Sequence, residues 1–547
     1  MRRLLLTTCL IGLLSVSAQQ TVTKADIVTA EKMFDLSFTQ VKRDSMLSVL
    51  SDRIKTYNYF HKNNLSNDVA FPLWYNPVLP NMTVPKKQLA FQFSIPENVA
   101  LPADKSELAF YSIPQLASLI KHKKISSESL TKFYIERLKK YGSTLHCVIE
   151  LTEKLALEQA KKADAEIAKG MYKGPLHGIP YGIKDLFSVK GTHTTWGTPP
   201  YKNQTLDETA FVAAQLQKAG AVLVAKLSLG ELAMDDVWFG GLTRNPWDTS
   251  KGSGGSSAGS ASATAAGLVP FAIGTETYGS IVDPSMRCGT TGLRPTYGSI
   301  SKSGAMTLAW TSDKIGPICR SAEDAAIVFN YIHGSDKIDA SSINAAFNYT
   351  GKIDISKLKI AYVKNYIDSL PENSTEKQTL AVLKKMGAKI TAFDFPDDLH
   401  GDEILGLIVS VESAAAFDPL TRSSKDDEMV QQNKDRWPNT FRSARFVPAV
   451  EYITACRLRY QIMQKMDPIL NQFDIIIAPP ETGDQLAITN LTGNPSITIP
   501  NGFLQNGMPA SISFIGKHFN EATLLAFTKA YQMQTGFHLK HPSMFSK

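Results

Sequence analysis

Along the C-terminal four-fifths of the chain, short apolar runs alternate with longer stretches in which apolar residues recur every three or four positions. The apolar runs predict buried strands at residues 221–225, 271–273, 360–363, 475–478, 497–499 and 512–515. The periodic stretches predict helices at residues 126–142, 152–169, 207–219, 322–333, 375–386 and 521–534. Because strands alternate with helices, the pattern predicts an α/β fold in which helices cover both faces of a sheet.

Two of the predicted helices have clear boundaries in the sequence. Ser126 or Ser127 can cap the first helix at its start, and Gly142 can end it. The second helix is rich in alanine and stops at Gly170.

The first hundred residues depart from this alternation. Residues 24–60 are polar with spaced apolar positions, which predicts one or two surface helices. Residues 71–103 are dense in proline, which favours an extended connection. We therefore divide the chain into an N-terminal helical extension with its proline-rich connection, residues 19–105, and a main domain, residues 106–547.

Residues 1–18 form a segment of a different kind. Arg2 and Arg3 precede an apolar run, and small residues follow at positions 16–18. This arrangement is typical of a secretory signal peptide. The alternative is a membrane anchor, which the short run disfavours because a span needs about 20 apolar residues. We expect an exported protein, periplasmic or extracellular, with no integral membrane segment once the leader is removed.

Composition narrows the classes of function. The 547 residues are 43% hydrophobic and 20% charged, which is ordinary for a globular protein. The net charge is +7, but the basic residues are scattered along the chain, so we do not expect nucleic-acid binding.

The five cysteines do not form a metal-binding pattern. Cys9 lies in the leader, and none of the others makes a C-x-x-C pair, which argues against a zinc site. We expect buried free thiols and leave one disulfide open. Asn81 and Asn490 begin Asn-x-Ser/Thr sequons, which matter only in a host that glycosylates.

The stretch 252–260, Gly-Ser-Gly-Gly-Ser-Ser-Ala-Gly-Ser, holds two neighbouring serines. A flexible linker is disfavoured because helix-forming residues follow at once, and a phosphate-binding loop would need a Gly-Lys-Ser/Thr ending. Ser257 also matches the G-x-S-x-G nucleophile elbow. That motif requires a strand directly before it, whereas the preceding residues predict a loop.

A lysine and two serines together suit acyl transfer. Ser280 follows a predicted strand and a turn at Gly274, where consecutive backbone N–H groups can stabilise an oxyanion; the alternative is an ordinary turn serine. Lys184 lies in an apolar segment, where it either pairs with Asp185 or, desolvated, loses its charge and serves as a general base. Ser256 can relay a proton between them from a loop that glycines free to bend.

Lys184, Ser256 and Ser280 each lie in one of several motifs that follow one another along the chain. From about Ser106 to the C-terminus the chain resembles the amidase signature family, which includes amidotransferase A subunits and peptide and fatty-acid amidases. The motifs, in the family's order, are residues 174–185, 245–247, 254–260, 274–281 and 292–295. The resemblance implies one large domain with a central mixed sheet between helices, cleavage of a carboxamide C–N bond, no cofactor and no metal.

The resemblance also implies roles for individual residues. Ser280 corresponds to the nucleophile, Lys184 to the base, and Ser256 to a bridging serine that follows a cis peptide bond from Gly255. The backbone N–H groups implied for the oxyanion hole are those of Thr277, Tyr278, Gly279 and Ser280.

The chain departs from the family beside the nucleophile. The family often has Asp at Glu276, Gly at Tyr278 and Arg at Val282, which Asp283 follows here. These differences change charge and bulk, so the resemblance does not carry a substrate. Tyr278 either shapes the leaving-group side or packs, and we favour packing. By its order in the chain, the stretch 412–418 is expected to line the acyl pocket.

Three hypotheses follow. The leading one is an exported, stand-alone amidase that acts on a small-molecule or peptide amide, as a monomer or a homodimer. The second is an amidotransferase-type glutaminase subunit that supplies ammonia to a partner, although such cytosolic work disagrees with the leader. The third is a catalytically inactive binding protein on the same scaffold, which the three filled catalytic positions disfavour.

Overall fold

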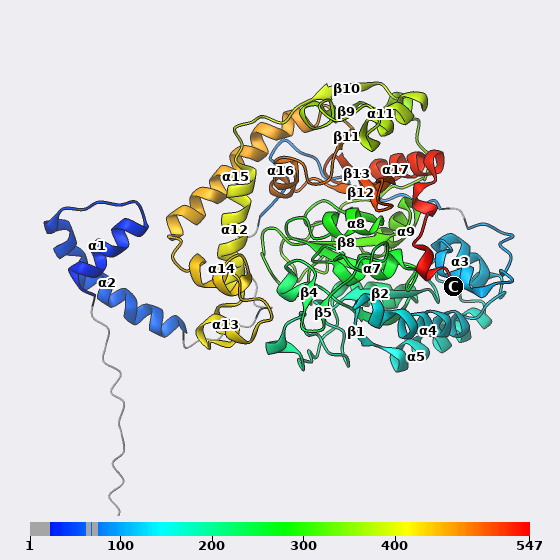
Figure 1. Ribbon diagram of the computed structural model, residues 1–547, viewed down its shortest axis with the longest axis horizontal. Coiled ribbons are helices and arrows are strands. Elements are labelled where there is room, and N and C mark those ends of the chain that lie inside the picture. The colour runs from blue at the N-terminus through cyan, green and yellow to red at the C-terminus, as the bar shows by residue number, and fades with distance from the viewer. Residues whose placement is uncertain (1–21, 62–66, 68–74, 94) are drawn as a thin grey trace, which may run out of the picture. The chain divides into compact units, whose positions relative to one another are not determined.

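The computed structural model describes residues 22–61, 67, 75–93 and 95–547 (Figure 1). The predicted leader, with Cys9, lies outside these residues. Contacts divide the chain into two units, which are described separately: residues 1–65 with 446–448, and residues 66–445 with 449–547.

The first unit contains two helices, as the pattern of residues 24–60 predicts. Helix α1 spans Lys24–Met33 and α2 spans Gln40–His61. Thr23 and Asp26 form a capping box at the start of α1. An ion pair of 2.8 Å between Arg43 and Glu31 joins the two helices.

The second unit is built on an eleven-stranded mixed sheet in the order β1-β3-β2-β6-β8-β7-β12-β13-β11-β9-β10. Pairing is parallel for β3-β2-β6 and for β11-β9-β10, and antiparallel elsewhere. The strands are β1 (Val148–Leu151), β2 (Pro180–Lys184), β3 (Val222–Leu227), β6 (Ala272–Glu276), β7 (Thr291–Arg294), β8 (Lys314–Cys319), β9 (Ile360–Val363), β10 (Ile390–Phe393), β11 (Ile475–Ala478), β12 (Ser496–Phe503) and β13 (Pro509–Gly516). Strands β4 (Val237–Trp238) and β5 (Gly241–Leu242) form a separate hairpin.

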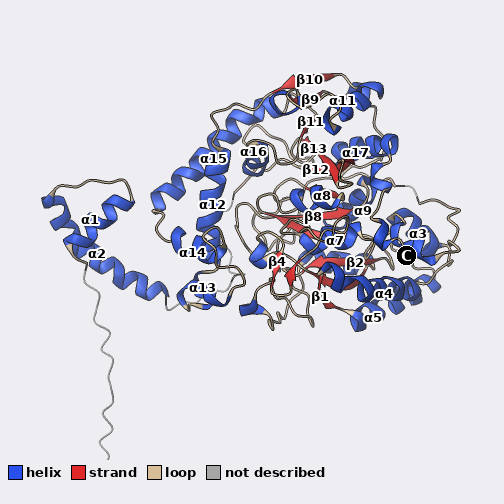
Figure 2. Cartoon of the chain, viewed as in Figure 1, coloured by secondary structure: helices blue, strands red, loops and turns tan. Residues whose placement is uncertain are grey.

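Helices surround the strands of the sheet, as Figure 2 shows. They are α3 (Ile113–Lys121), α4 (Ser127–Leu145), α5 (Glu153–Ala168), α6 (Phe211–Ala219), α7 (Ala258–Ala265), α8 (Val282–Cys288), α9 (Ala322–Ile332), α10 (Lys364–Ile367), α11 (Thr375–Lys385), α12 (Gly401–Ala416), α13 (Asp418–Arg422), α14 (Trp437–Ala444), α15 (Ala449–Leu470), α16 (Gln485–Thr492) and α17 (Glu521–Thr535). Short 3-10 helices span Lys105–Phe110, Pro199–Tyr201, Glu231–Ala233, Ile355–Lys357, Lys425–Glu428, Phe537–Leu539 and Ser543–Phe545. The predicted α/β fold is therefore confirmed.

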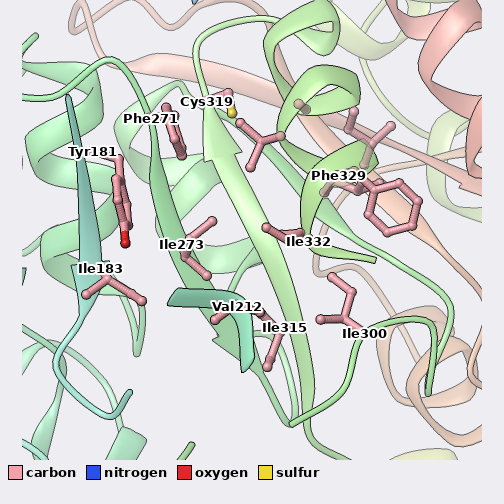
Figure 3. Packing of buried hydrophobic residues seen from close by; sticks show 14 of the residues in the cluster. Tyr181, Ile183, Val212, Phe271, Ile273, Ile300, Ile315, Cys319, Phe329 and Ile332 are labelled. Carbon is pink, nitrogen blue, oxygen red and sulfur yellow. The ribbon is translucent and has the colours of Figure 1, made fainter. Parts of the chain in front are cut away.

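The main core packs against the central strands of the sheet. Side chains of β2, β6 and β8 pack there with those of α6 and α9, as Figure 3 shows for Ile183, Val212, Ile273, Ile315 and others. Every residue of β2, β3, β6 and β8 is buried, so neither face of these strands is exposed to solvent, and polar side chains such as Lys184 and Lys226 are buried with them.

Several predicted boundaries are wrong. Helix α4 continues through Gly142 to Leu145, and the left-handed residue that follows it is His146, with φ 50°. Residues 207–210 precede α6 and are not helical. Gly274 is no turn, because β6 runs through it to Glu276. A Cβ at Gly274 would lie 2.7 Å from the Ser257 hydroxyl, so close packing explains this glycine.

The remaining expectations concern the connection, the thiols and the sequons. Residues 75–93 and 95–103 carry no helix or strand, as the proline density predicts. All four cysteines after the leader are free. Asn490 is fully buried, and its side chain donates to Glu276, so this sequon cannot carry a glycan in the folded protein.

Candidate active site

Lys184 is the last residue of β2, between β3 and β6 in the middle of one half of the sheet. Its side chain is fully buried. The ammonium Nζ lies 2.8 Å from Ser256 Oγ, 3.1 Å from Ser257 Oγ and 2.9 Å from Thr275 Oγ1. The lysine therefore points into a cluster of hydroxyl groups supplied by the loop before α7 and by strand β6.

The neighbouring Asp185 does not neutralise Lys184. Asp185 instead forms a buried ion pair of 2.7 Å with Lys226 on β3. It also accepts hydrogen bonds from the backbone and hydroxyl of Thr195. The alternative of a Lys184–Asp185 pair is thus excluded, because successive residues of an extended strand point to opposite sides.

Burial lowers the pKa of Lys184 well below its ordinary value, and the more distant Asp313 and Glu276 only partly oppose this. A neutral lysine has two N–H donors and one lone pair. The Ser257 hydroxyl donates its single proton to the Thr275 carbonyl in a hydrogen bond. It can therefore only accept a hydrogen bond from Lys184. The hydroxyls of Ser256 and Thr275 are then the groups that can donate to the lysine lone pair.

The loop before α7 holds Ser256 against the lysine. The peptide bond from Gly255 to Ser256 is cis, as the family resemblance implies. The backbone N–H of Gly255 donates to Asp283 at 2.8 Å, and that of Gly254 donates to Asp236 at 2.9 Å. A Cβ at Gly255 would lie 1.7 Å from the Asp235 carbonyl oxygen, so no other residue fits there.

Ser257 is not placed as a nucleophile elbow. It follows a loop rather than a strand and precedes the first residue of α7. Its hydroxyl is buried between Lys184 and Thr275, where it accepts from the Thr275 N–H at 3.1 Å. Ser257 thus joins the loop to β6 instead of facing a ligand.

Ser280 lies in the turn between β6 and α8 and is 8% exposed. Gly279, with φ 85°, makes the turn possible. In the described part of the chain, no group accepts a hydrogen bond from the backbone N–H of Tyr278, Gly279 or Ser280. These donors are therefore available to an oxygen atom outside the protein.

The buried carboxylate of Glu276 holds the turn that carries Ser280 in place. Glu276 accepts hydrogen bonds from the N–H groups of Ile281 and Val282, at 2.9 and 3.0 Å, and from Arg294 at 2.9 Å. Burial acts to raise the pKa of Glu276, but the charges of Arg294 and Lys314 outweigh it and hold the pKa at about 2. The carboxylate stays ionised, so it anchors the first backbone groups after Ser280.

Two more contacts hold the other side of the turn. The Thr277 hydroxyl donates to Asp313 at 2.6 Å, and Asp313 is fixed in turn by the N–H groups of Leu308 and Ala309. Tyr278 is 38% exposed, and its hydroxyl donates to Asp402 at the start of α12. Tyr278 is therefore not a packed core residue, contrary to the preferred expectation.

The stretch 412–418 has structural contacts of its own. Glu412 accepts from the Thr311 hydroxyl at 2.6 Å, and Phe417 is buried against Trp196 and Phe441. Its expected place along an acyl pocket stays a prediction.

The structure brings the three predicted residues into one locality. Lys184 and Ser256 are hydrogen-bonded, and the Ser257 N–H donates to the Ser280 carbonyl at 3.1 Å. Among the hydrogen bonds of the described residues, none joins the Ser256 and Ser280 hydroxyls. The link between the two loops is therefore made by backbone and by Asp283, which lies three residues after Ser280 and bonds Gly255.

Sequence reasoning missed Thr275, Asp236 and Asp283 as partners of the site. Thr275 lies one residue past the mistaken turn at Gly274, so a correct end for β6 would have pointed to it. Asp283 was noted only as a change of charge, and nothing in the sequence signals its bond to the Gly255 backbone.

Comparison with known proteins identifies the family. The amidase family model matches residues 129–525. The A subunit of glutamyl-tRNA(Gln) amidotransferase from Geobacillus kaustophilus is 33% identical over 481 residues, covering 79% of this chain and 99% of the relative. The corresponding subunit from Coxiella burnetii is 34% identical over 484 residues with the same coverage. The chain belongs to the amidase signature family.

Solved structures share the fold. Peptide amidase from Stenotrophomonas maltophilia superposes with a TM-score of 0.72 at 26% identity, covering 81% of this chain and all of that one. A bacterial aryl acylamidase of the amidase signature family superposes with a TM-score of 0.71 at 21% identity, covering 80% and 98%. Together with the family match, these likenesses define an amidase-type hydrolase on a single α/β domain.

No helix in the described ranges has the length and apolar character that crossing a membrane requires.

Proposed function

We propose that the protein is an exported amidase that hydrolyses a carboxamide through an acyl-enzyme on Ser280. Lys184 serves as the base and Ser256 carries the proton between them. The observation that supports this most strongly is the buried Lys184, whose Nζ lies 2.8 Å from Ser256 Oγ with no carboxylate in contact. Such a lysine can accept a proton near neutral pH.

In the acylation step, Ser280 Oγ attacks the amide carbon while its proton passes to Ser256, whose own proton passes to Lys184. This requires the Ser280 hydroxyl to approach Ser256 when substrate binds, which the turn at Gly279 permits. The carbon–nitrogen bond then breaks as the nitrogen takes the proton back from Lys184 through Ser256. The leaving group departs as ammonia or a neutral amine.

The tetrahedral intermediate carries its negative charge on the former carbonyl oxygen. The unpaired N–H groups of Tyr278, Gly279 and Ser280, with that of Thr277 beside them, are the donors we assign to it. Because Glu276 and Asp313 fix both sides of the turn, these donors need little rearrangement. In the second half of the reaction, water loses a proton to the same relay and attacks the ester, which releases the carboxylic acid.

A panel of amides tests this proposal. Glutamine, a peptide amide, an anilide and a fatty amide are incubated with the protein, and ammonia or amine release is measured. We expect turnover of at least one class, loss of that turnover in Ser280→Ala, and retention in Ser262→Ala. Ser262 is a matched control because it is a buried serine on α7 that bonds the Arg244 carbonyl. Turnover that survives in Ser280→Ala would refute the assignment.

Export is proposed from residues 1–18 alone. Amino-terminal sequencing of the protein recovered from a secreting host should show a start near Gln19. An intact leader on cytoplasmic protein would contradict export.

The second candidate is a glutaminase subunit of an amidotransferase, favoured by the near-complete coverage of the curated relatives. The panel of amides distinguishes the stand-alone amidase from the amidotransferase subunit. A stand-alone amidase releases its amine or ammonia without another protein, whereas a subunit should hydrolyse glutamine alone and respond to its partner.

A further inference from the structure

A groove lies along the outer side of α15, apart from the candidate active site. Its volume is about 1030 Å³, and its walls come from α15 and from the segment 75–80. Apolar side chains dominate the lining, among them Val78, Ile453 and Met463. The volume suits a ligand of small-molecule size, because such pockets measure about 300–1,000 Å³.

A buried guanidinium lies at one wall of this groove. Arg459 is only 3% exposed, and two of its nitrogens donate to the Leu491 carbonyl at 2.8 Å and to the Thr311 carbonyl at 3.0 Å. Its third nitrogen, Nη2, has no acceptor among the described residues. A buried donor left unpaired is costly, so this nitrogen is suited to an acceptor that the ligand supplies.

A second unpaired donor accompanies it. The ring of Tyr75 lies 3.5 Å from the Arg459 guanidinium carbon, and its buried hydroxyl lies within reach of that side chain but has no acceptor for its own proton among the described residues. Burial raises the pKa of Tyr75, so the hydroxyl keeps its proton and can donate. Arg457 adds a further cation to the lining, while no aspartate or glutamate is among the described residues that form it.

The nearest carboxylate belongs to a separate set of bonds. Glu412, deeper in the protein, accepts from the Thr311 hydroxyl at 2.6 Å and from Tyr452 at 2.9 Å. Burial raises the pKa of Glu412, although its hydrogen bonds and the charge of Arg459 act to lower it. Arg457 and Arg459 give the wall of the groove a positive character beside an apolar channel.

We propose that this groove binds an aliphatic carboxylate, with its head group on Arg459 Nη2 and the Tyr75 hydroxyl and its chain along the apolar side of α15. A carboxylate offers two acceptor oxygens, which matches the two unpaired donors. The apolar lining then removes the hydrocarbon chain from water. This binding does not depend on catalysis at Ser280.

The thiol of Cys456 provides a local measurement. Cys456 lines the groove and is partly exposed, whereas the other three described cysteines are buried. The intact protein is treated with a maleimide at mildly alkaline pH, and labelling at Cys456 is followed by peptide mass spectrometry. We expect decanoate to slow this labelling about 5-fold or more, and decan-1-ol at the same concentration to slow it less than 2-fold, because the alcohol lacks the charge.

Conservative variants test the head-group contacts. Arg459→Lys keeps the charge but removes the planar fork, so half-maximal protection should need about 10-fold more decanoate. Tyr75→Phe should need about 3-fold more, since one hydrogen bond is lost. The matched control is Tyr362→Phe, whose hydroxyl bonds Asp368 outside the groove and whose loss should change nothing.

Arg459→Lys could be misfolded, which circular dichroism would show. In that case Tyr75→Phe and the comparison of decanoate with decan-1-ol still test whether the groove binds a carboxylate. Equal protection by decanoate and decan-1-ol would overturn the proposal, because the groove would then be merely apolar. So would the absence of any protection, or unchanged protection in both folded variants.

Discussion

Two buried lysines on adjacent strands show how surroundings divide chemical roles between identical side chains. Lys226 is held in an ion pair by Asp185, which suits a fixed structural cation. Lys184 contacts three hydroxyl groups and, at 3.5 Å, the Thr275 carbonyl, and none of these partners carries a charge that offsets the cost of burying its own. The difference makes Lys184 the lysine that can gain and lose a proton during a reaction.

This difference predicts a pH profile. Only neutral Lys184 can accept a proton, so the rate at which a fluorophosphonate inactivates the protein should rise with pH. The midpoint of the rise should lie well below 10.5, because burial lowers the lysine pKa from that ordinary value. Lys184→Ala should reduce the rate about 100-fold or more and flatten the profile. A rate that is flat from pH 6 to 10 in the unchanged protein would contradict the base assignment.

At this scale the sequence singles out candidate residues but not their partners. Lys184, Ser256 and Ser280 could be singled out because a lysine in an apolar segment and serines beside glycines are unusual. Their contacts could not, because the hydroxyl of Thr275 and the carboxylate of Asp283 reach the site only once strands distant in the chain pair.

At the scale of elements, the site depends on two loops, each of which ends at the start of a helix. The loop before α7 carries Ser256, and the turn before α8 carries Ser280. Asp283 connects them, since it lies in the first turn of α8 and accepts from the Gly255 N–H. The relative position of the two serines therefore depends on this carboxylate and on the backbone hydrogen bond from Ser257 to Ser280.

Changing that carboxylate should affect the reaction more than the fold. Asp283→Asn keeps the size of the side chain but weakens its hold on Gly255, because the neutral amide is a poorer acceptor than the carboxylate. We expect kcat on the best amide of the panel to fall about 10-fold, with KM little changed and the melting temperature lowered by only a few degrees. Asp248→Asn, which alters a surface loop carboxylate bonded to Ser250, is the matched control. Equal kcat in Asp283→Asn and the unchanged protein would show that Asp283 does not position the two serines for the reaction.

The sequence predicted about half of the helices and strands that the structure describes, and two of the missed elements have clear physical causes. Strand β2 was missed because Pro180 and Gly182 interrupt its apolar pattern, although a Cβ at Gly182 would meet Leu227 at 2.4 Å and so explains the glycine. Helix α15 was missed because its exposed side also carries apolar residues, among them Val450 and Ile453, which blur the helical period.

At the scale of the whole molecule, every contact assigned to the site lies within the second unit. That unit holds the sheet, the main core and both loops, while the first unit contributes α1 and α2. The predicted division at residue 105 stays a prediction.

Removing the N-terminal helices should therefore leave the site intact. A chain that begins at residue 66 is expected to keep the fluorophosphonate inactivation rate within about 2-fold, because no hydrogen bond assigned to Lys184, Ser256 or Ser280 comes from the first unit. The control is the full chain without its leader. A loss of more than 10-fold in a folded, monodisperse truncation would show that the extension takes part in the reaction.

The most direct measurement is the position of the covalent adduct. The purified protein is treated with a fluorophosphonate near pH 8, digested and mapped by mass spectrometry. We expect one adduct, on Ser280, which is absent in Ser280→Ala and strongly reduced in Lys184→Ala. An adduct on Ser256 or Ser257, or no adduct on folded protein, would contradict the central claim that Ser280 is the nucleophile and Lys184 its base.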